Sequence, residues 1–438
     1  MKAVIMCGGR GTRMGDLAKE IPKGLIEIGG KSILEHQVEL LKKYGIVDIW
    51  MTVGHLKEPI MDYFGNGEKF GVKIQYYEEE EPLGTTGGVK KIAKELDSDF
   101  LILYGDVLVH MDLGKLIAFH KNHDADATLV VHPNDHPQDS DLVEMDFSCK
   151  ITAFHSKKEI EGKFFHNMVN AGLYVLKSPV VDELPDKGDF GTDFFPAVVD
   201  KMKLFGYNTA EYLKDMGTPS RLEEVNKAFV SGKVKRCGKE HKRKAIFVDR
   251  DGTINKEVKL LHKLEDMELL PGAAEAIRKL NLTEYLVIMI SNQPVVARGL
   301  VSMEGLDEIH KKMEWLLGKE GAKLDGMYFC PHHFEKGFPE ENKFYKYTCL
   351  CRKPGTLMIE TAVKDFNIEL EGSWMIGDFA GDVLCGQNAG VKTAVIDGTR
   401  SIDTTHDGTK VKADLVVESL KVAIDTILQQ CLKDDKDL

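Results

Sequence analysis

The chain has 438 residues, of which 43% are hydrophobic and 29% are charged, and its formal net charge is −12. This length exceeds one typical core and predicts two or three domains. An acidic balance without a long basic block argues against nucleic acid or an anionic membrane as the main partner. No apolar run reaches the roughly 18 to 20 residues that span a bilayer, and the N-terminal residues lack a signal-peptide core, so we expect a cytoplasmic protein.

The first half alternates short apolar segments with amphipathic ones. The pattern predicts strands at residues 2–6, 46–53 and 100–104 and a helix at residues 33–44. This alternation is typical of a doubly wound parallel sheet. Ligands of such sheets bind beyond the carboxyl ends of the strands, so the residues that follow each strand are the candidate site residues.

A glycine-rich loop, Cys7 to Met14, follows the first strand. Its backbone N–H groups can face a phosphate chain, and Arg13 can neutralise the charge there. Lys23 supplies a second cation. The loop has neither the GxxxxGK[ST] nor the GxGxxG spacing, and an ordinary glycine-rich turn is the alternative. Asp106 follows a later strand and Asp215 lies beside a turn, so both are candidate Mg²⁺ ligands, although either one alone is more often a solvated turn residue.

Six segments in this order resemble the sugar-1-phosphate nucleotidylyltransferases. They are Gly8 to Met14, Pro22-Lys23, Leu83 to Gly87, Gly105-Asp106, Asn170 to Gly172 and Asp215 to Pro219. The resemblance covers about residues 1–230 and implies nucleotide transfer from a nucleoside triphosphate to a sugar 1-phosphate, with release of pyrophosphate. It assigns catalysis to Arg13 and Lys23, and Mg²⁺ binding to Asp106 and Asp215. It places the nucleotide and substrate contacts at Gly8, Gly9, Gly11, Thr12, Gly84, Gly105, Lys157 and Asn170. Lys157 lies where the family has FxEKP, but Ser156 and Lys158 stand in place of the Glu and the Pro.

A polar and basic segment joins the two halves. We expect a nucleotidyltransferase domain at residues 1–232, a linker at residues 233–243 and a phosphatase domain at residues 244–438. The basic residues are more typical of a solvated face than of a nucleic-acid site.

The second half opens with the apolar run Ala245 to Val248, which ends at Asp249 and Asp251. A buried strand with two carboxylates at its carboxyl end can bind a hard cation, and one carboxylate can attack phosphorus. An acidic turn is the alternative reading of these residues. Two later predicted strands, 285–290 and 374–376, lead to Ser291 and to the acids Asp378 and Asp382.

Three cysteines cluster with a histidine near residue 340. Cys330, His332, Cys349 and Cys351 can complete a tetrahedral Cys₃His zinc shell. No open position is left, so such a zinc ion would be structural and would close a loop that is poor in core residues. His333 is the rival ligand, and free cysteines in a reducing cytoplasm are the alternative.

This half resembles the haloacid dehalogenase superfamily over about residues 244–430, through Asp249 to Thr253, Ser291, Lys353 and Gly377 to Asp382. The Cys/His group before Arg352 resembles the branch that contains heptose 1,7-bisphosphate phosphatases and histidinol-phosphate phosphatases. The resemblance implies that Asp249 is the nucleophile, that Asp251 is the general acid and base, and that Ser291 and Lys353 bind the phosphoryl oxygens. It places Mg²⁺ on Asp249, Asp378 and the backbone carbonyl of Asp251, and substrate contacts at Asn292, Arg298 and Arg352. Phe379 and Pro294-Val295 replace the Lys and the Ser-Gly of the branch.

The fold class expected is therefore α/β, with two doubly wound, Rossmann-like domains in tandem and a zinc-stapled loop in the second. The two resemblances imply a bifunctional, Mg²⁺-dependent enzyme that removes the 7-phosphate of D-glycero-D-manno-heptose 1,7-bisphosphate and transfers GMP from GTP to heptose 1-phosphate. Mannose or glucose 1-phosphate, histidinol phosphate or another monoester, and a catalytically inactive sugar-nucleotide-binding regulator are the alternatives. The base, the anomer and the oligomeric state, a homo-oligomer included, stay open at this stage.

Overall fold

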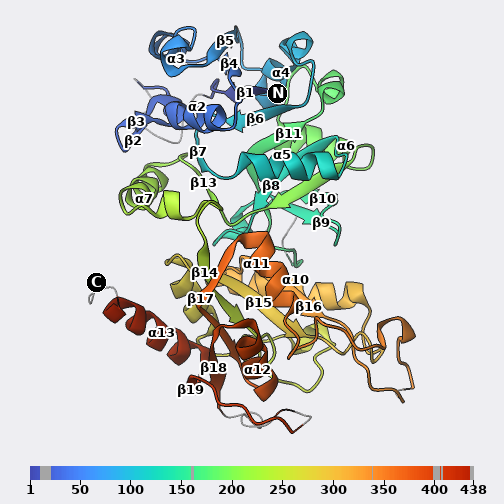
Figure 1. Cartoon of the computed structure of the whole chain (residues 1–438). Coiled ribbons are helices and arrows are strands. Elements are labelled where there is room, and N and C mark those ends of the chain that lie inside the picture. Colours follow the sequence, from blue (N-terminus) through green and yellow to red (C-terminus); the bar gives the residue numbers. More distant parts are fainter. Residues whose placement is uncertain (10–20, 159–161, 338, 398–404, 406–407, 435–438) are drawn as a thin grey trace. The chain divides into compact units, whose positions relative to one another are not determined.

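The computed structural model describes the chain except for residues 10–20, 159–161, 338, 398–404, 406–407 and 435–438. It divides into two compact units (Figure 1). The first unit contains residues 1–132, 141–156 and 168–240, and the second contains residues 133–140, 157–167 and 241–438. The predicted boundaries at 232 and 244 stay predictions, and two short segments predicted in the first domain group with the second unit.

The described part of the first unit is built on a nine-stranded sheet. Its strands are β1 (Lys2–Met6), β4 (Asp48–Val53), β5 (Lys73–Glu78), β6 (Phe100–Tyr104), β8 (Ala127–His132), β9 (Leu142–Met145), β10 (Ile151–His155), β11 (Val169–Leu176) and β12 (Leu204–Asn208). The order is β10-β9-β11-β6-β1-β4-β5, with β8 beside β11 and β12 beside β8. Strands β6, β1, β4 and β5 are parallel, whereas β11 runs antiparallel to β6. The sheet is thus parallel where the predicted site residues follow the strands, and mixed beyond β6.

Two small sheets accompany this large one. They pair β2 (Glu27–Ile28) with β3 (Lys31–Ser32), and β7 (Val107–His110) with β13 (Tyr212–Asp215). The α-helices in the described residues of the first unit are α2 (Ile33–Lys43), α3 (Lys57–Phe64), α4 (Gly84–Lys91), α5 (Leu113–Asn122), α6 (Phe195–Val198), α7 (Pro219–Val230) and α8 (Lys233–Arg236). Helix α8 occupies the start of the predicted linker.

Alternate side chains of β1 enter two different cores, one on each face of the sheet. Ala3 and Ile5 belong to the cluster that contains Leu34 of α2, while Val4 belongs to the cluster that contains Val89 of α4. Helices therefore cover both faces, which confirms the doubly wound α/β class. Burial on both faces also explains why this strand reads as a continuous apolar run.

The second unit contains a six-stranded sheet in its described residues, with the order β16-β15-β14-β17-β18-β19 and every pair parallel. The strands are β14 (Arg243–Val248), β15 (Leu286–Asn292), β16 (Gly326–Cys330), β17 (Ile368–Gly377), β18 (Lys392–Ile396) and β19 (Leu415–Val417). The helices are α9 (Ala273–Asn281), α10 (Met303–Lys319), α11 (Leu357–Phe366), α12 (Ala380–Ala389) and α13 (Leu420–Asp434). The central strand β14 is the apolar run predicted from the sequence, and Ala245 to Val248 are fully buried.

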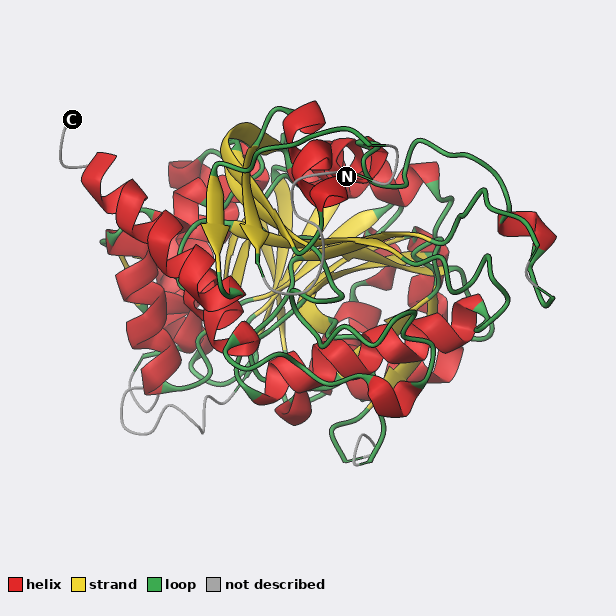
Figure 2. Cartoon of the chain, turned by 90° about the horizontal axis from the view of Figure 1, so that it is seen from below, coloured by secondary structure: helices red, strands yellow, loops and turns green. Residues whose placement is uncertain are grey.

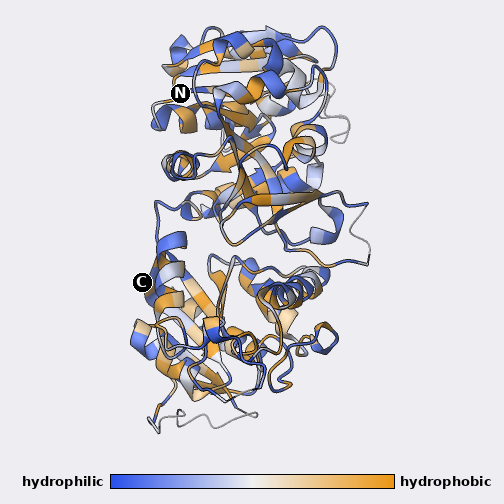
Figure 3. Ribbon diagram, turned by 90° about the vertical axis from the view of Figure 1, so that its right-hand side faces the viewer, coloured by the Kyte–Doolittle hydropathy of each residue, from blue (hydrophilic) through white to orange (hydrophobic). Residues whose placement is uncertain are grey.

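Figure 2 shows the strands together with the helices that flank them, and Figure 3 shows that the strands of each unit carry much of the hydrophobic sequence. None of the helices in the described ranges is both long enough and apolar enough to cross a membrane.

Candidate active sites

A cavity of about 320 Å³ lies at the carboxyl ends of the parallel strands in the first unit. Strands β1 and β6 pair in register up to Met6 and Tyr104, and the Gly105 N–H donates to the Met6 carbonyl at 2.9 Å. The chain leaves these strands as a glycine loop and as a Gly-Asp pair. The cavity is lined by six of the predicted residues, namely Gly8, Gly9, Lys23, Gly84, Gly105 and Asp106. The predicted residues Gly11, Thr12 and Arg13 lie outside the described residues.

Gly84 shows why a glycine is needed at one wall of this cavity. Its φ is +74°, and a Cβ at this position would lie 2.2 Å from the backbone oxygen of Gly188. A side chain would therefore clash with backbone that has no room to move, in addition to the cost of a left-handed conformation. The close approach fixes the start of α4 beside the cavity.

Lys23 and Asp106 face each other in the cavity. The Lys23 Nζ lies 3.2 Å from the Asp106 Oδ2, and both side chains are largely shielded from solvent. Pro22 is extended, with φ −57° and ψ 137°, and Lys23 begins a short 3₁₀ turn. A phosphate group would attract the ammonium and a divalent cation would attract the carboxylate. The pair can therefore bind a metal–phosphate complex if Lys23 turns from Asp106 to the phosphate and Asp106 turns from Lys23 to the metal.

The backbone beside Asp215 is hydrogen-bonded to the backbone of Asp106, but the Asp215 carboxylate binds a different side chain. The Met216 N–H donates to the Asp106 carbonyl at 3.0 Å. Both carboxylate oxygens of Asp215 accept hydrogen bonds from Arg221 Nη1, at 2.6 and 2.8 Å. Its predicted role as a Mg²⁺ ligand stays a prediction, and it requires release from Arg221.

Two further predicted contacts of the transferase are described in the structure. The Asn170 Nδ2 donates to the Tyr174 hydroxyl at 2.8 Å, and its Oδ1 accepts from the Gly172 N–H at 3.1 Å. Lys157 is exposed and its ammonium lies 3.1 Å from Asp139. Their contacts with a sugar phosphate stay predictions.

The second site lies at the carboxyl end of β14 between β15 and β17. The Lys353 Nζ lies 2.7 Å from Asp249 Oδ1 and 2.6 Å from Asp382 Oδ1, and it donates to the Ile290 carbonyl at 2.9 Å. One carboxylate oxygen from each of Asp249, Asp378 and Asp382 lies within 4.8 Å of the others. These buried acids form a group that can hold a cation. The sequence predicted cation binding by acids at the strand ends, but the resemblance did not place the Mg²⁺ on Asp382.

Burial and charge oppose each other at this cluster. Burial raises the pKa of Asp249, and the neighbouring Asp382 and Asp378 raise it further, while Lys353 pulls it down. Burial opposes the charge on Lys353, but Asp249 and Asp382 hold its pKa above the usual range. Lys353 is therefore a permanent cation, and a second cation bound to the acids would keep Asp249 ionised.

Gly252 allows Asp378 to approach the nucleophile loop. Its φ is +76°, and a Cβ there would lie 2.1 Å from Asp378 Oδ2. The glycine in the Asp-Gly-Thr segment is thus required by backbone conformation and by the neighbouring carboxylate together.

Asp251 is held by three side chains. Arg250 donates from Nη2 to both carboxylate oxygens at 2.9 Å, the Asn255 amide donates at 3.0 Å and the Gln293 amide donates at 2.7 Å. Burial alone would raise the pKa of Asp251, but Arg250 and these hydrogen bonds lower it below its usual value. The Gln293 Nε2 also donates to Ser291 Oγ at 2.9 Å, so one amide orients both groups.

Asn292 holds the backbone of Lys353. Its amide donates to the Lys353 carbonyl at 3.1 Å and its oxygen accepts from the Lys353 N–H at 2.9 Å. Its side chain is therefore engaged in positioning the lysine, and the contact with substrate that was predicted for it stays a prediction.

A cavity of about 860 Å³ opens from Asp249, Asp251 and Lys353 and also reaches Arg298, Arg352 and His333. Burial, together with the charges of Arg352 and Arg298, lowers the pKa of His333 to about 4, so this histidine is neutral at pH 7. Burial also lowers the pKa of Arg352, and repulsion from Arg298 adds to that effect. Arg298 Nη2 also lies 3.6 Å from Glu335 Oε2. The two guanidinium groups can still bind an anion, which would offset the repulsion between them.

Cys330, His332, Cys349 and Cys351 bring their four donor atoms within 4.8 Å of one another. The sulfur atoms are separated by 3.1 to 3.4 Å, far more than the roughly 2.05 Å of a disulfide. His332 Nδ1 lies 3.3 Å from Cys351 Sγ. The set can bind a metal ion, and His332 is its histidine, whereas His333 Nδ1 accepts from the Glu335 N–H at 3.2 Å.

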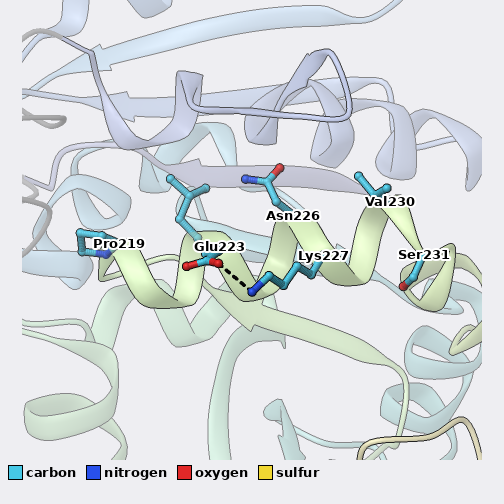
Figure 4. A pocket seen from close by; sticks show the side chains of 7 residues that line it. Pro219, Glu223, Asn226, Lys227, Val230 and Ser231 are labelled. Atoms are coloured by element: carbon cyan, nitrogen blue, oxygen red, sulfur yellow. Dashed lines mark ion pairs between the residues drawn. The ribbon is translucent and has the colours of Figure 1, made fainter.

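The hollow beside α7 contains no converging polar groups (Figure 4). Its side chains all come from this helix and the following residue, and they include the ion pair Glu223–Lys227 at 2.6 Å. We assign no catalytic site to it.

Sequence reasoning missed the residues that position the predicted catalytic groups. They are Arg221 at Asp215, and Arg250, Asn255 and Gln293 at Asp251. Arg250 lies in the sequence between Asp249 and Asp251, and Gln293 follows Asn292, so both residues are next to predicted site residues. Only their distances to Asp251 in the structure reveal that they position it.

Both halves match known proteins. A family model described as nucleotidyl transferase matches residues 2–232, and one described as HAD-hydrolase-like matches residues 350–423. The D-glycero-beta-D-manno-heptose-1,7-bisphosphate 7-phosphatase of Haemophilus ducreyi is 39% identical over 179 residues, which are 41% of this chain and 94% of that relative. The mannose-1-phosphate guanylyltransferase of Mycobacterium tuberculosis is 33% identical over 235 residues, which are 52% of this chain and 65% of that relative, just under two thirds of its length. The solved structure of HddC from Yersinia pseudotuberculosis is 26% identical with a TM-score of 0.46, and covers 52% of this chain and 99% of that one.

The folds and sites of the two units define an enzyme with a nucleotidyltransferase half and a phosphatase half. The chain belongs to the nucleotidyl transferase family through residues 2–232 and, through its second half, to the HAD-like phosphatase family of the Haemophilus relative.

Proposed function

We propose that this chain is a bifunctional enzyme that makes a nucleotide-activated heptose. The phosphatase half hydrolyses D-glycero-D-manno-heptose 1,7-bisphosphate to heptose 1-phosphate and inorganic phosphate. The transferase half joins heptose 1-phosphate to GMP from GTP and releases pyrophosphate. The proposal is supported by similarity to a heptose bisphosphate phosphatase in one half and to a mannose-1-phosphate guanylyltransferase in the other.

One observation carries the choice of a bisphosphate. The cavity that contains Asp249 and Lys353 also contains the cation pair Arg298 and Arg352. A monoester needs only the residues around Asp249 and Lys353, whereas a sugar with a phosphate at each end can also bind to the arginine pair. The product keeps one phosphate, and it is the anionic substrate that the transferase half requires.

In the phosphatase reaction, the Asp249 carboxylate attacks the phosphorus of the 7-phosphate and the bond to the sugar oxygen breaks. Arg250 holds the pKa of Asp251 low in the substrate-free site, so Asp251 must take up a proton when the anionic substrate binds. It then gives this proton to the leaving oxygen and later takes one from the water that hydrolyses the aspartyl phosphate. Lys353, 2.7 Å from Asp249, and Ser291 neutralise charge on the phosphoryl oxygens. Asp249, Asp378 and the Asp251 backbone carbonyl would hold a Mg²⁺ ion, which supplies charge that offsets the repulsion between carboxylate and phosphate.

In the transferase reaction, an oxygen of the sugar phosphate attacks the α-phosphorus and pyrophosphate leaves. The attacking phosphate is already an anion, so positioning and charge neutralisation dominate. Lys23 would lie beside the phosphates, and Asp106 with Asp215 would hold Mg²⁺.

Incubation with heptose 1,7-bisphosphate, Mg²⁺ and each of GTP, ATP, CTP and UTP tests the proposal. Mass spectrometry is expected to detect phosphate, pyrophosphate and GDP-heptose. Mannose 1-phosphate, glucose 1-phosphate and histidinol phosphate serve as competing substrates. Release of phosphate without any nucleotide conjugate would refute the proposed order of reactions, and release of neither product would favour a binding protein.

We propose zinc as the metal of the Cys₃His group. Tetrahedral ligands at the usual zinc distances lie roughly 3.5 to 3.8 Å apart, close to the spacing observed here. Lys353 is two residues after Cys351, so the metal would hold in place the segment that contains the catalytic lysine.

Replacement of Cys351 by serine is expected to lower both zinc content and phosphatase activity. Loss of one thiolate should weaken zinc binding at least about tenfold and let the segment around Lys353 move, which should reduce phosphatase kcat/KM at least about tenfold. Metal analysis and phosphate-release kinetics measure the two effects. Cys431→Ser, which changes a cysteine outside the group, is the control. Full zinc content and activity in Cys351→Ser would contradict the assignment.

A further inference from the structure

A fully buried arginine lies behind the proposed acid–base residue of the phosphatase half. Asp251 lines the 860 Å³ cavity, whereas Arg250 and His310 are buried and do not line it. A buried guanidinium needs acceptors for its N–H groups, because each unpaired one has lost its hydration without compensation. Asp251 accepts from Nε and Nη2 of Arg250. The partner of the remaining nitrogen, Nη1, is therefore the contact whose purpose has to be found.

His310, on the buried face of α10, is that partner. Arg250 Nη1 lies 3.1 Å from His310 Nε2. A guanidinium only donates hydrogen bonds, so Nε2 must accept and the ring proton must be on Nδ1. Burial and the charge of Arg250 hold the pKa of His310 well below its ordinary value, which keeps the ring neutral and able to accept. The ring also packs against Phe329 of β16, with 5.0 Å between the ring centroids, which restricts its rotation.

The position of the guanidinium determines which oxygen of Asp251 stays available. Oδ1 accepts from Arg250 Nε at 3.2 Å, from Arg250 Nη2 at 2.9 Å and from the Asn255 amide at 3.0 Å. Oδ2 accepts from the Gln293 amide at 2.7 Å and shares the Arg250 Nη2 donor, at 2.9 Å, with Oδ1. A carboxylate oxygen has two lone pairs, so three donors saturate Oδ1. Oδ2 is therefore the oxygen that can exchange a proton while the guanidinium stays in place.

We propose that His310 is a positioning residue of the phosphatase reaction. By accepting from Arg250 Nη1 it holds the guanidinium against Oδ1 of Asp251, which reserves Oδ2 for the leaving group. In that step the bond from Asp249 to phosphorus forms, the bond from phosphorus to the sugar oxygen breaks, and the Asp251 proton moves to that oxygen. His310 acts through Arg250 and does not touch the substrate. The inference deepens the proposed phosphatase function and rests on it.

The dependence of the reaction on the leaving group tests this role. Heptose 1,7-bisphosphate releases an alkoxide that needs a proton, whereas p-nitrophenyl phosphate releases a phenolate that is a far weaker base. With the full chain and Mg²⁺, His310→Leu is expected to lower kcat/KM about 10- to 100-fold for the heptose substrate and less than about threefold for the aryl phosphate, because only the first needs a well-oriented general acid. The ratio of the two kcat/KM values does not depend on the amount of folded enzyme, so partial unfolding of a variant cannot imitate the effect.

Two further variants separate hydrogen bonding from packing. His310→Gln places an amide oxygen near the position of Nε2 and should return the ratio to within about threefold of the wild-type value. Met313→Ala is the matched control, because Met313 is a fully buried residue of the same helix. It should lower the melting temperature through lost packing and leave the ratio unchanged.

Two results would overturn the assignment of His310. They are a His310→Leu variant with the wild-type ratio, and a His310→Gln variant with the same ratio as His310→Leu. If the wild-type protein does not hydrolyse heptose 1,7-bisphosphate, the proposed substrate is refuted, and fructose 1,6-bisphosphate takes its place as the alkyl phosphate in the same comparison. The two proposals therefore fail separately.

Discussion

Asp249→Asn is expected to lower phosphatase kcat at least on the order of 10⁴-fold, because the amide keeps the shape of the side chain but cannot attack phosphorus. Lys353 keeps its contact with Asp382 at 2.6 Å, so the site should stay assembled. Phosphate release from heptose 1,7-bisphosphate measures the loss. Transfer of GMP to supplied heptose 1-phosphate should change by less than about twofold, since the transferase residues belong to another unit.

Asp266→Asn is the matched control for this variant, because Asp266 is an exposed acid of the same unit. It should leave both reactions unchanged. Substantial phosphatase activity in Asp249→Asn would exclude Asp249 as the nucleophile, and loss of both activities would contradict independent sites.

Lys23→Met is expected to lower transferase kcat/KM about 10²- to 10³-fold. The ammonium lies 3.2 Å from Asp106 in the cavity, and its removal takes away a fixed positive charge beside the proposed position of the reacting phosphates. Pyrophosphate release with heptose 1-phosphate and GTP measures the effect. Methionine keeps most of the apolar stem, so lost packing contributes little.

Lys31→Met provides the comparison for the transferase, since the Lys31 side chain is 43% exposed and pairs with Glu39 at 2.5 Å. It should retain full transferase activity, and both variants should retain phosphatase activity. If Lys23→Met reacts as fast as Lys31→Met, the phosphates bind elsewhere in the first unit.

The local sequence was sufficient to predict the strands whose ends carry the site residues. The run Ala245 to Val248 predicted a buried strand because strands covered on both faces are apolar throughout. The structure confirms it as the central strand β14, with β15 and β17 parallel on either side. The acids at 249 and 378 then meet because the carboxyl ends of parallel neighbours share one edge of the sheet.

The sequence did not predict which charged side chains pair with each other within the sites. Asp215 contacts Arg221 of α7, and Asp382 contacts Lys353, although no spacing rule connects either pair. His332 and His333 were equivalent candidates until geometry placed only His332 beside the sulfur atoms. Two segments of the predicted transferase domain group with the second unit.

The sequence by itself determined the α/β class and the order of the strand-end acids, because these depend on residue types at fixed local spacings. Its resemblance to two known families indicated the two enzyme halves. Tertiary structure decided which charge neutralises which and where the cavities open. Those outcomes depend on distances between atoms far apart in the chain. Such distances arise only when the sheets assemble and bury these groups together.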